Sequence, residues 1–141
     1  MPNWYALASV LLACLALEGC SRIPGVIDAR DLKPVIQQSR SPTGSFQVAM
    51  ISRGYGGAVG GTTYLVYIRR RGAQKAYLML RGLRLLKVSF EWHGDNMLDI
   101  SMACGDVQAF SNNFYYRDKK ANELEKVTLN LHSDAVCPPL P

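Results

Sequence analysis

Apolar and polar residues alternate at a period of two along much of this chain, most clearly from Leu86 to Trp92. The inward set is Val88, Phe90 and Trp92, and the outward set is Lys87, Ser89, Glu91 and His93. Such alternation is typical of an antiparallel strand with one buried and one solvated face. An amphipathic helix would need apolar residues three and four apart, and that spacing is almost absent. The pattern therefore predicts a β fold.

Other strand-like segments follow the same rule and are separated by turn signals. They are residues 46–51, 62–68, 76–80, 97–103, 110–117 and 126–132. Segment 35–38 fits either a helix end or a first edge strand, and we favour the strand. Segment 62–68 is so rich in β-branched and aromatic residues that we expect a central strand. The sequence thus predicts an all-β fold, a single small antiparallel domain of about seven strands arranged as a sandwich or a bent meander.

Two turn motifs predict how neighbouring strands connect. Ser41-Pro42-Thr43-Gly44 combines a Pro that presets φ with a Gly that accepts positive φ, so it should lead into the strand at Phe46. His93-Gly94-Asp95-Asn96 is a hairpin signal. The apolar residues after this hairpin should share the face of Trp92; they are Leu98, Ile100 and Met102.

A glycine-rich segment, Arg53 to Gly61, has five glycines in nine residues. It lacks the Lys of a P-loop, since Thr62 follows Gly61, and Val59 stands where the third Gly of the dinucleotide fingerprint belongs. Both motifs also lead into a helix, whereas this segment leads into a strand. We therefore expect a flexible hairpin loop here, and we assign no cofactor.

The N-terminal segment has the composition of a targeting signal. Its apolar core, Ala6 to Leu17, holds only Ala, Leu, Val, Ser and Cys, and it is shorter than the roughly 20 apolar residues of a spanning helix. The end of this core, Leu17-Glu18-Gly19-Cys20, resembles the lipobox of bacterial lipoproteins. That resemblance implies cleavage before Cys20, a lipid on Cys20 and a membrane as partner. A secretory signal cut elsewhere and an uncleaved anchor are the alternatives.

The same resemblance implies a domain organisation and a location. Residues 1–19 would be a lipoprotein-type signal peptide, residues 20–33 the lipidated Cys and a tether, and residues 34–141 the antiparallel β domain. The protein would belong to the cell envelope, lipid-anchored to a membrane facing the periplasm or exterior. Ser21 after the Cys resembles lipoproteins sent on to an outer membrane, where the cell has one.

A second resemblance lies within the β domain. A Ser-Pro-x-Gly turn and strand, a Gly-Ala loop and a Thr-rich strand are similar to those of small bacterial exported lipoprotein domains of unknown function. The matching residues are Ser41, Pro42, Gly44, Gly57, Ala58, Thr62 and Thr63. This resemblance implies no particular activity.

Cysteine usage depends on that location. Cys14 would leave with the signal and Cys20 would carry the lipid, which leaves Cys104 and Cys137. In an oxidising compartment two remaining thiols of a small domain usually pair, so we expect a disulfide between them. Neither a C-x-x-C nor a Cys/His zinc spacing is present, and we assign no metal.

The formal net charge of +5 points to anionic partners. For an exported chain these are anionic lipid or envelope polymer, and we expect no nucleic acid. The densest basic run has seven cations in nineteen residues and no acid: Arg69, Arg70, Arg71, Lys75, Arg81, Arg84 and Lys87. We treat them as a candidate anionic-surface site, with a solvated face that protects sheet edges as the alternative. The sequence identifies no protein partner.

Residues suited to catalysis are few. His93 falls in a turn and His132 on the outward side of the last segment, so both are expected to be solvated surface residues. Asp95, Asp99 and Asp106 are close in sequence but form no calcium-loop pattern. We therefore assign no catalytic residue and expect a non-enzymatic binding or structural module of the cell envelope. A small exported hydrolase-like enzyme with an unrecognised site is the alternative.

Overall fold

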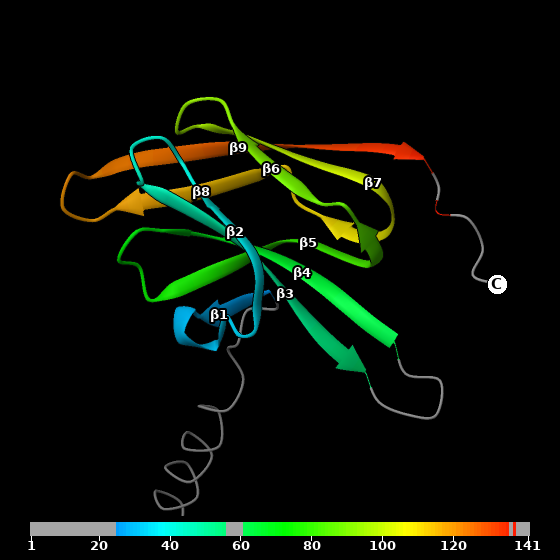
Figure 1. Cartoon of the computed structure of the whole chain (residues 1–141). Coiled ribbons are helices and arrows are strands. Elements are labelled where there is room, and N and C mark those ends of the chain that lie inside the picture. The colour runs from blue at the N-terminus through cyan, green and yellow to red at the C-terminus, as the bar shows by residue number, and fades with distance from the viewer. Residues whose placement is uncertain (1–24, 56–60, 136, 138–141) are drawn as a thin grey trace, which may run out of the picture.

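The computed structural model describes residues 25–55, 61–135 and 137, and in these residues it forms one sheet of nine strands (Figure 1). A single 3-10 turn, η1, follows the first strand. The elements are β1 (Val26–Asp28), η1 (Ala29–Asp31), β2 (Val35–Arg40), β3 (Phe46–Tyr55), β4 (Gly61–Arg70), β5 (Lys75–Leu86), β6 (Ser89–Trp92), β7 (Met97–Phe110), β8 (Asn113–Asp118) and β9 (Glu123–Ala135). The predicted all-β single domain is confirmed.

The strand order is β2-β3-β4-β5-β7-β9-β8, with β1 paired to β5 and β6 paired to β7. All described pairs are antiparallel except β7 with β9, which is parallel. Strand β8 follows β7 along the chain but pairs only with β9, which lies between β7 and β8 in the sheet. Because β8 is antiparallel to β9, β9 runs parallel to β7. The sheet is therefore mixed at this one pair, and it has more strands than the seven expected.

The sheet bends over on itself and encloses its core (Figure 1). Strands β3 to β5 form a lower layer in this view, and β6 to β9 form an upper one. The inner core lies between the layers and includes Val48, Val66, Ile68, Leu80, Leu98, Ile100, Met102, Phe114, Val127 and Leu129. This arrangement is the bent form of the predicted meander, and it leaves an outer face on each layer.

The bend is built into β5 and β7. Arg84 and Lys87 have positive φ values of 51° and 52°, and the β5–β7 register shifts on either side of Leu83. These irregularities turn Leu85 inward, where it is 4% exposed. The sequence segment 86–92 is consequently divided, since β5 ends at Leu86 and β6 begins at Ser89.

A smaller apolar cluster covers part of the outer face of the lower layer. It consists of Leu32, Ala49, Ile51, Leu65, Tyr67 and Ala76, with Ile27 and Leu78 packed against it. We call this side of β3 to β5 the outer face. Because β1 pairs with β5 and Leu32 packs on this face, the chain from Val26 to Leu32 belongs to the β domain. The expected tether, residues 20–33, was therefore wrong from Val26 onward.

Several local predictions are confirmed. Strand β4 lies inside the sheet with four consecutive buried residues, and β2 is the edge strand favoured for segment 35–38. In the β6–β7 hairpin Trp92 pairs with Leu98, so these residues share a face. Pairing of β3 with β4 reaches Tyr55 and Gly61, which makes their connection a hairpin, while residues 56–60 lie outside the described residues. Segment 110–117 was wrong as one strand, because β7 ends at Phe110 and β8 begins at Asn113.

Candidate functional site

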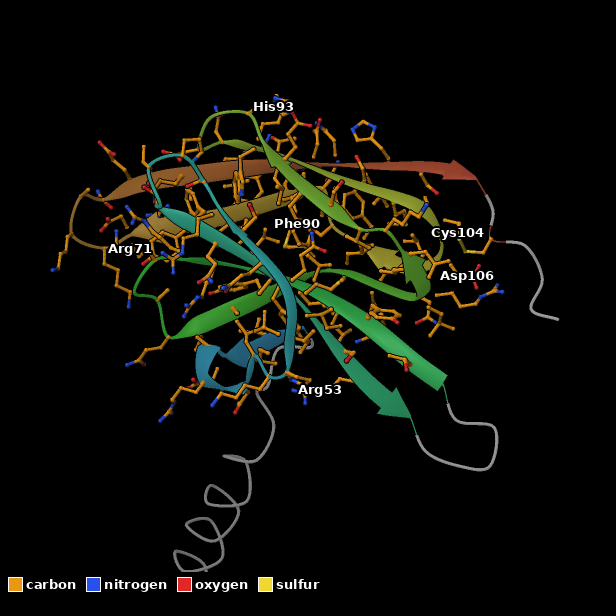
Figure 2. The ribbon with its side chains drawn as sticks, in the orientation of Figure 1. Arg53, Arg71, Phe90, His93, Cys104 and Asp106 are labelled. Atoms are coloured by element: carbon orange, nitrogen blue, oxygen red, sulfur yellow. A yellow bond between two sulfur atoms is a disulfide. The ribbon has the colours of Figure 1, made fainter. Side chains whose placement is uncertain are left out.

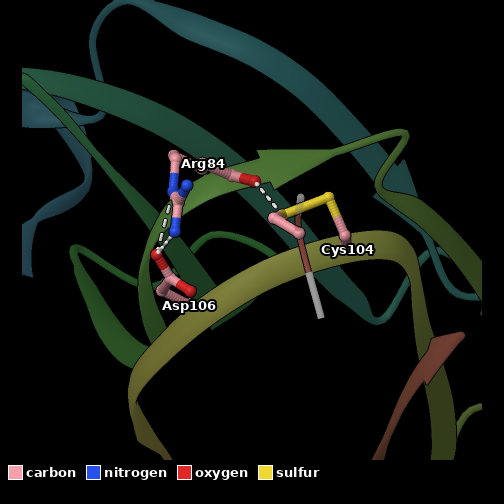
Figure 3. Close-up of a disulfide and its surroundings, with 4 residues drawn as sticks. Arg84, Cys104 and Asp106 are labelled. Carbon is pink, nitrogen blue, oxygen red and sulfur yellow. Dashed lines mark hydrogen bonds and ion pairs between the residues drawn. A yellow bond between two sulfur atoms is a disulfide. The ribbon is translucent and has the colours of Figure 1, made fainter. Parts of the chain in front are cut away.

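Cys104 and Cys137 form the expected disulfide, with their Cα atoms 4.9 Å apart. Both residues are buried, and the Cys137 sulfur lies 3.6 Å from the backbone carbonyl oxygen of Arg84 (Figure 3). The bond thus ties the C-terminal segment to β7 and to the bent part of β5. Cys14 and Cys20, including the predicted lipidation site, lie outside the described residues.

Two cations of the predicted basic site are engaged with acids. Arg70 Nε donates to Glu125 Oε2 at 2.6 Å, and this hydrogen bond is the main reason that the pKa of Arg70 is raised. Its guanidinium also lies over the rings of Phe46 and Tyr116. Arg84 Nη2 donates to Asp106 Oδ2 at 2.6 Å (Figure 3). Their charges are largely neutralised within the domain.

The other five cations are spread from the end of β4, along β5, to the residue after it. Arg69 donates to the side-chain oxygen of Gln47, at 2.7 Å from Nη2. Arg71 and Lys75 lie at the β4–β5 turn, whereas Lys87 follows the far end of β5. A straight strand of 12 residues spans about 36 Å, so these groups are distributed over that length. The seven cations are therefore spread along β4 and β5, and two of them are paired with acids within the domain.

The upper layer brings two histidines to one carboxylate. His93 Nε2 lies 3.0 Å, and His132 Nε2 3.6 Å, from the same oxygen of Asp99. Asn130 donates to the other oxygen of Asp99 at 2.8 Å. The hydrogen bond from Asn130, followed by the bond and charge of His93 and the charge of His132, holds the pKa of Asp99 below its usual value. We call these four residues the histidine–aspartate cluster.

This cluster follows from strand pairing. His93 ends the β6 side of the hairpin, and the parallel β7–β9 register sets Asp99 opposite Asn130 and Ser101 opposite His132. Sequence reasoning placed both histidines on the surface, where they are, with side chains 41% and 55% exposed. It missed their convergence, because no local pattern predicted that β7 and β9 are neighbours.

The three aspartates considered together in the sequence lie in different environments. Asp95 accepts from the amide of Thr43 at 3.1 Å and from its hydroxyl, which joins the β6–β7 turn to the Ser41 turn. These bonds and one from Ser41 lower the pKa of Asp95. Asp99 belongs to the histidine–aspartate cluster, and Asp106 pairs with Arg84. The three form no common site.

The cluster has acid–base groups but an open setting. A carboxylate can orient an imidazole and stabilise its charged form, as general acid–base catalysis requires. Catalytic sites also exclude water, whereas both imidazoles here are about half exposed. Within the described ranges, no group of three or more His, Cys, Asp or Glu residues is arranged to hold a metal ion.

The described part of the chain contains no helix long and apolar enough to cross a membrane. Comparison with known proteins adds no assignment for the domain. No protein family, curated protein or solved structure matches this chain.

Proposed function

We propose that this protein is a lipid-anchored module of the bacterial cell envelope, which binds or supports other envelope components without catalysing a reaction. The observation that carries the proposal is the sequence Leu17-Glu18-Gly19-Cys20 at the end of an apolar core. A diacylated Cys20 would fix the domain to a membrane that faces the periplasm or the exterior. An outer membrane is favoured by Ser21 where the cell has one.

The disulfide supports an extracytoplasmic location. Structural disulfides form and persist in oxidising compartments and are rare in the cytosol. Cys104 and Cys137 are paired and buried, and they close a loop with a sequence separation of 33 residues. Their pairing is what an exported chain of this size is expected to show.

The anchoring is tested by expressing the full chain in a bacterial host fed with a labelled fatty acid. We expect label in the protein and recovery in the membrane fraction. Cys20→Ser should abolish the label and block processing, whereas Cys14→Ser, a matched control inside the apolar core, should change neither. Processing and membrane recovery of Cys20→Ser at the level of the unchanged chain would refute lipid anchoring.

The alternative of a small hydrolase-like enzyme would use the histidine–aspartate cluster. Its exposure favours the non-enzymatic proposal, because an open imidazole pair lacks a site that excludes water. Hydrolysis of simple ester substrates by the unchanged chain, lost in Asp99→Asn, would overturn the non-enzymatic proposal. We expect no difference between the two.

A further inference from the structure

Two arginines and one buried tyrosine belong to the outer face. Arg81 of β5 pairs with Leu65 of β4, and Tyr67 lies two residues further along β4 on the same side. Diagonal neighbours of this kind have Cβ atoms about 7–8 Å apart, which is within the reach of an arginine side chain. The sequence analysis included Arg81 in the basic run, but it considered Arg53 only as part of the glycine-rich loop.

Arg53 of β3 is opposite Thr63 of β4, which is on the same side of the sheet as Tyr67. Its Nη2 donates to the backbone carbonyl of Asp31 in η1 at 3.0 Å. Leu32, the residue directly after η1, packs in the same apolar cluster as Tyr67. The guanidinium of Arg53 is therefore held beside η1, and Figure 2 shows Arg53 on the side where β1 and η1 lie.

The charges of both arginines act on the tyrosine. Burial raises the pKa of Tyr67, and the positive charges of Arg53 and Arg81 both oppose that rise. Within the described residues, the one fully buried side-chain nitrogen or oxygen without a hydrogen-bond partner is Trp92 Nε1. The hydroxyl of Tyr67, a residue that is 6% exposed overall, therefore reaches the surface of the outer face.

Neither arginine is neutralised. Within the described residues, Arg53 and Arg81 form no ion pair, in contrast to Arg70 and Arg84. Asp31 contributes only its backbone carbonyl to Arg53. Both guanidinium groups therefore belong to exposed residues of the outer face, and most of their donors are unused within the described part of the chain.

We propose that Arg53, Arg81 and Tyr67 form a binding site for the phosphate group of an anionic phospholipid. Guanidinium groups bind phosphate through paired N–H donors, and a phenol can donate to a remaining oxygen. The site takes its charge from unpaired arginines, so it is complementary to a negatively charged membrane surface. It takes Arg81 from the run between Arg69 and Lys87 and adds Arg53 from β3.

The choice of a lipid as the occupant rests on the proposed anchor at Cys20. The amide of Leu78, a residue packed against the outer-face cluster, donates to the carbonyl of Gly25. Gly25 is five residues from Cys20 in sequence. Even a fully extended chain of that length spans no more than roughly 18 Å, so the two residues are within that distance. An anchored domain therefore has its outer face close to the headgroups, whereas His93 lies on the opposite side of the molecule (Figure 2).

The test uses the chain from Ser21 to Pro141, because every described strand, both apolar clusters and the disulfide lie within residues 25–137. Circular dichroism and thermal unfolding check that each variant is folded. Sedimentation with phosphatidylglycerol-containing vesicles is compared with sedimentation with pure phosphatidylcholine vesicles. We expect binding to the anionic vesicles only.

Two variants separate a site from general charge. Arg53→Gln with Arg81→Gln should weaken vesicle binding roughly 25-fold, since each cation near an anionic surface contributes about a factor of five. Tyr67→Phe keeps the charge and the ring, and it should weaken binding roughly tenfold by removing one hydrogen bond to a charged group. The matched control, Arg117→Gln with Lys119→Gln, removes two charges from exposed positions of β8 and its turn and should change binding less than twofold.

The proposed site would be refuted if the double variant of Arg53 and Arg81 lost no more vesicle affinity than the control double variant. It would also be refuted if the unchanged domain did not bind anionic vesicles. At matched ionic strength, excess inorganic phosphate should leave the protein on the vesicles, and its release would assign the site to free phosphate instead of lipid. The chain used here carries no acyl group. Failure of this test therefore leaves the anchoring at Cys20 standing, and failure of anchoring leaves this result unaffected.

Discussion

Leu85 occupies a space that two glycines leave open. A Cβ built on Gly105 would lie 2.5 Å from Leu85 Cδ2 and 3.0 Å from Met102 Sδ. A Cβ on Gly82 would lie 2.9 Å from the backbone oxygen of Asp106. The inward turn of Leu85 at the bend thus requires residues without side chains at both neighbouring positions.

Gly105→Ala should lower the free energy of unfolding by about 1–3 kcal/mol, because overpacking forces the Leu85 side chain and its surroundings to move. Urea denaturation measures this change. Gly54→Ala is the control, since nothing lies within 4 Å of its Cβ position and the variant should be nearly neutral. Adding Leu85→Ala should make the effect of Gly105→Ala smaller than in the unchanged background, because the two side chains compete for one space. Full additivity of the two changes would contradict the packing.

Asp99 links stability to pH through its hydrogen bond from Asn130 and its contacts with two histidines. Folding lowers its pKa below the ordinary value of 3.8, so folding favours the ionised carboxylate. The stabilisation is present above that ordinary value and is lost as the pH falls through the lower value of the folded state. Its direct contacts are Asn130, His93 and His132.

Asp99→Asn should therefore be less stable than the unchanged chain at pH 7, and the difference should shrink as the pH is lowered from about 4 toward 2. Urea denaturation at a series of pH values measures it. Glu91→Gln, a neighbouring exposed change opposite Asp99 in the β6–β7 register, should follow the unchanged chain throughout. A constant difference between Asp99→Asn and the unchanged chain over this range would contradict the linkage.

At the scale of elements, local patterns predicted strands and hairpins but not long-range pairing. The β6–β7 hairpin could be predicted because alternation and the turn at His93 to Asn96 lie in one short segment. The parallel β7–β9 pair could not, since strands of either direction show the same alternation. The histidine–aspartate cluster and the split of the basic run both depend on such pairing. Arg53, Arg81 and Tyr67 lie on three different strands, so no local pattern could place them on one face.

The disulfide joins Cys137 to Cys104, next to the last residues of the β7–β9 pair. The register of this strand pair runs as far as Cys104 opposite Ala135. Replacing Cys104 and Cys137 together by Ala should cost about 3–4 kcal/mol on the loop-entropy model for a separation of 33 residues. Thermal unfolding measures the loss, and hydrogen exchange should show the C-terminal end of β9 opening first. Unchanged stability, or uniform exchange along β9, would contradict this role.

The whole molecule has two unlike sides. Its outer face holds the N-terminal end of the described domain, the apolar cluster around Tyr67 and two unpaired arginines. The opposite side holds the histidine–aspartate cluster (Figure 2). A domain anchored at Cys20 would therefore present its basic side to the membrane and its acid–base cluster to the surrounding compartment.

Lipid anchoring is the central claim, and the intact mass of the mature protein, extracted from bacterial membranes, tests it most directly. The account predicts a chain that begins at Cys20, carries a diacylglyceryl group on that residue and has Cys104 and Cys137 joined. A mature chain that begins at any other residue, or one that begins at Cys20 without a lipid, would contradict it.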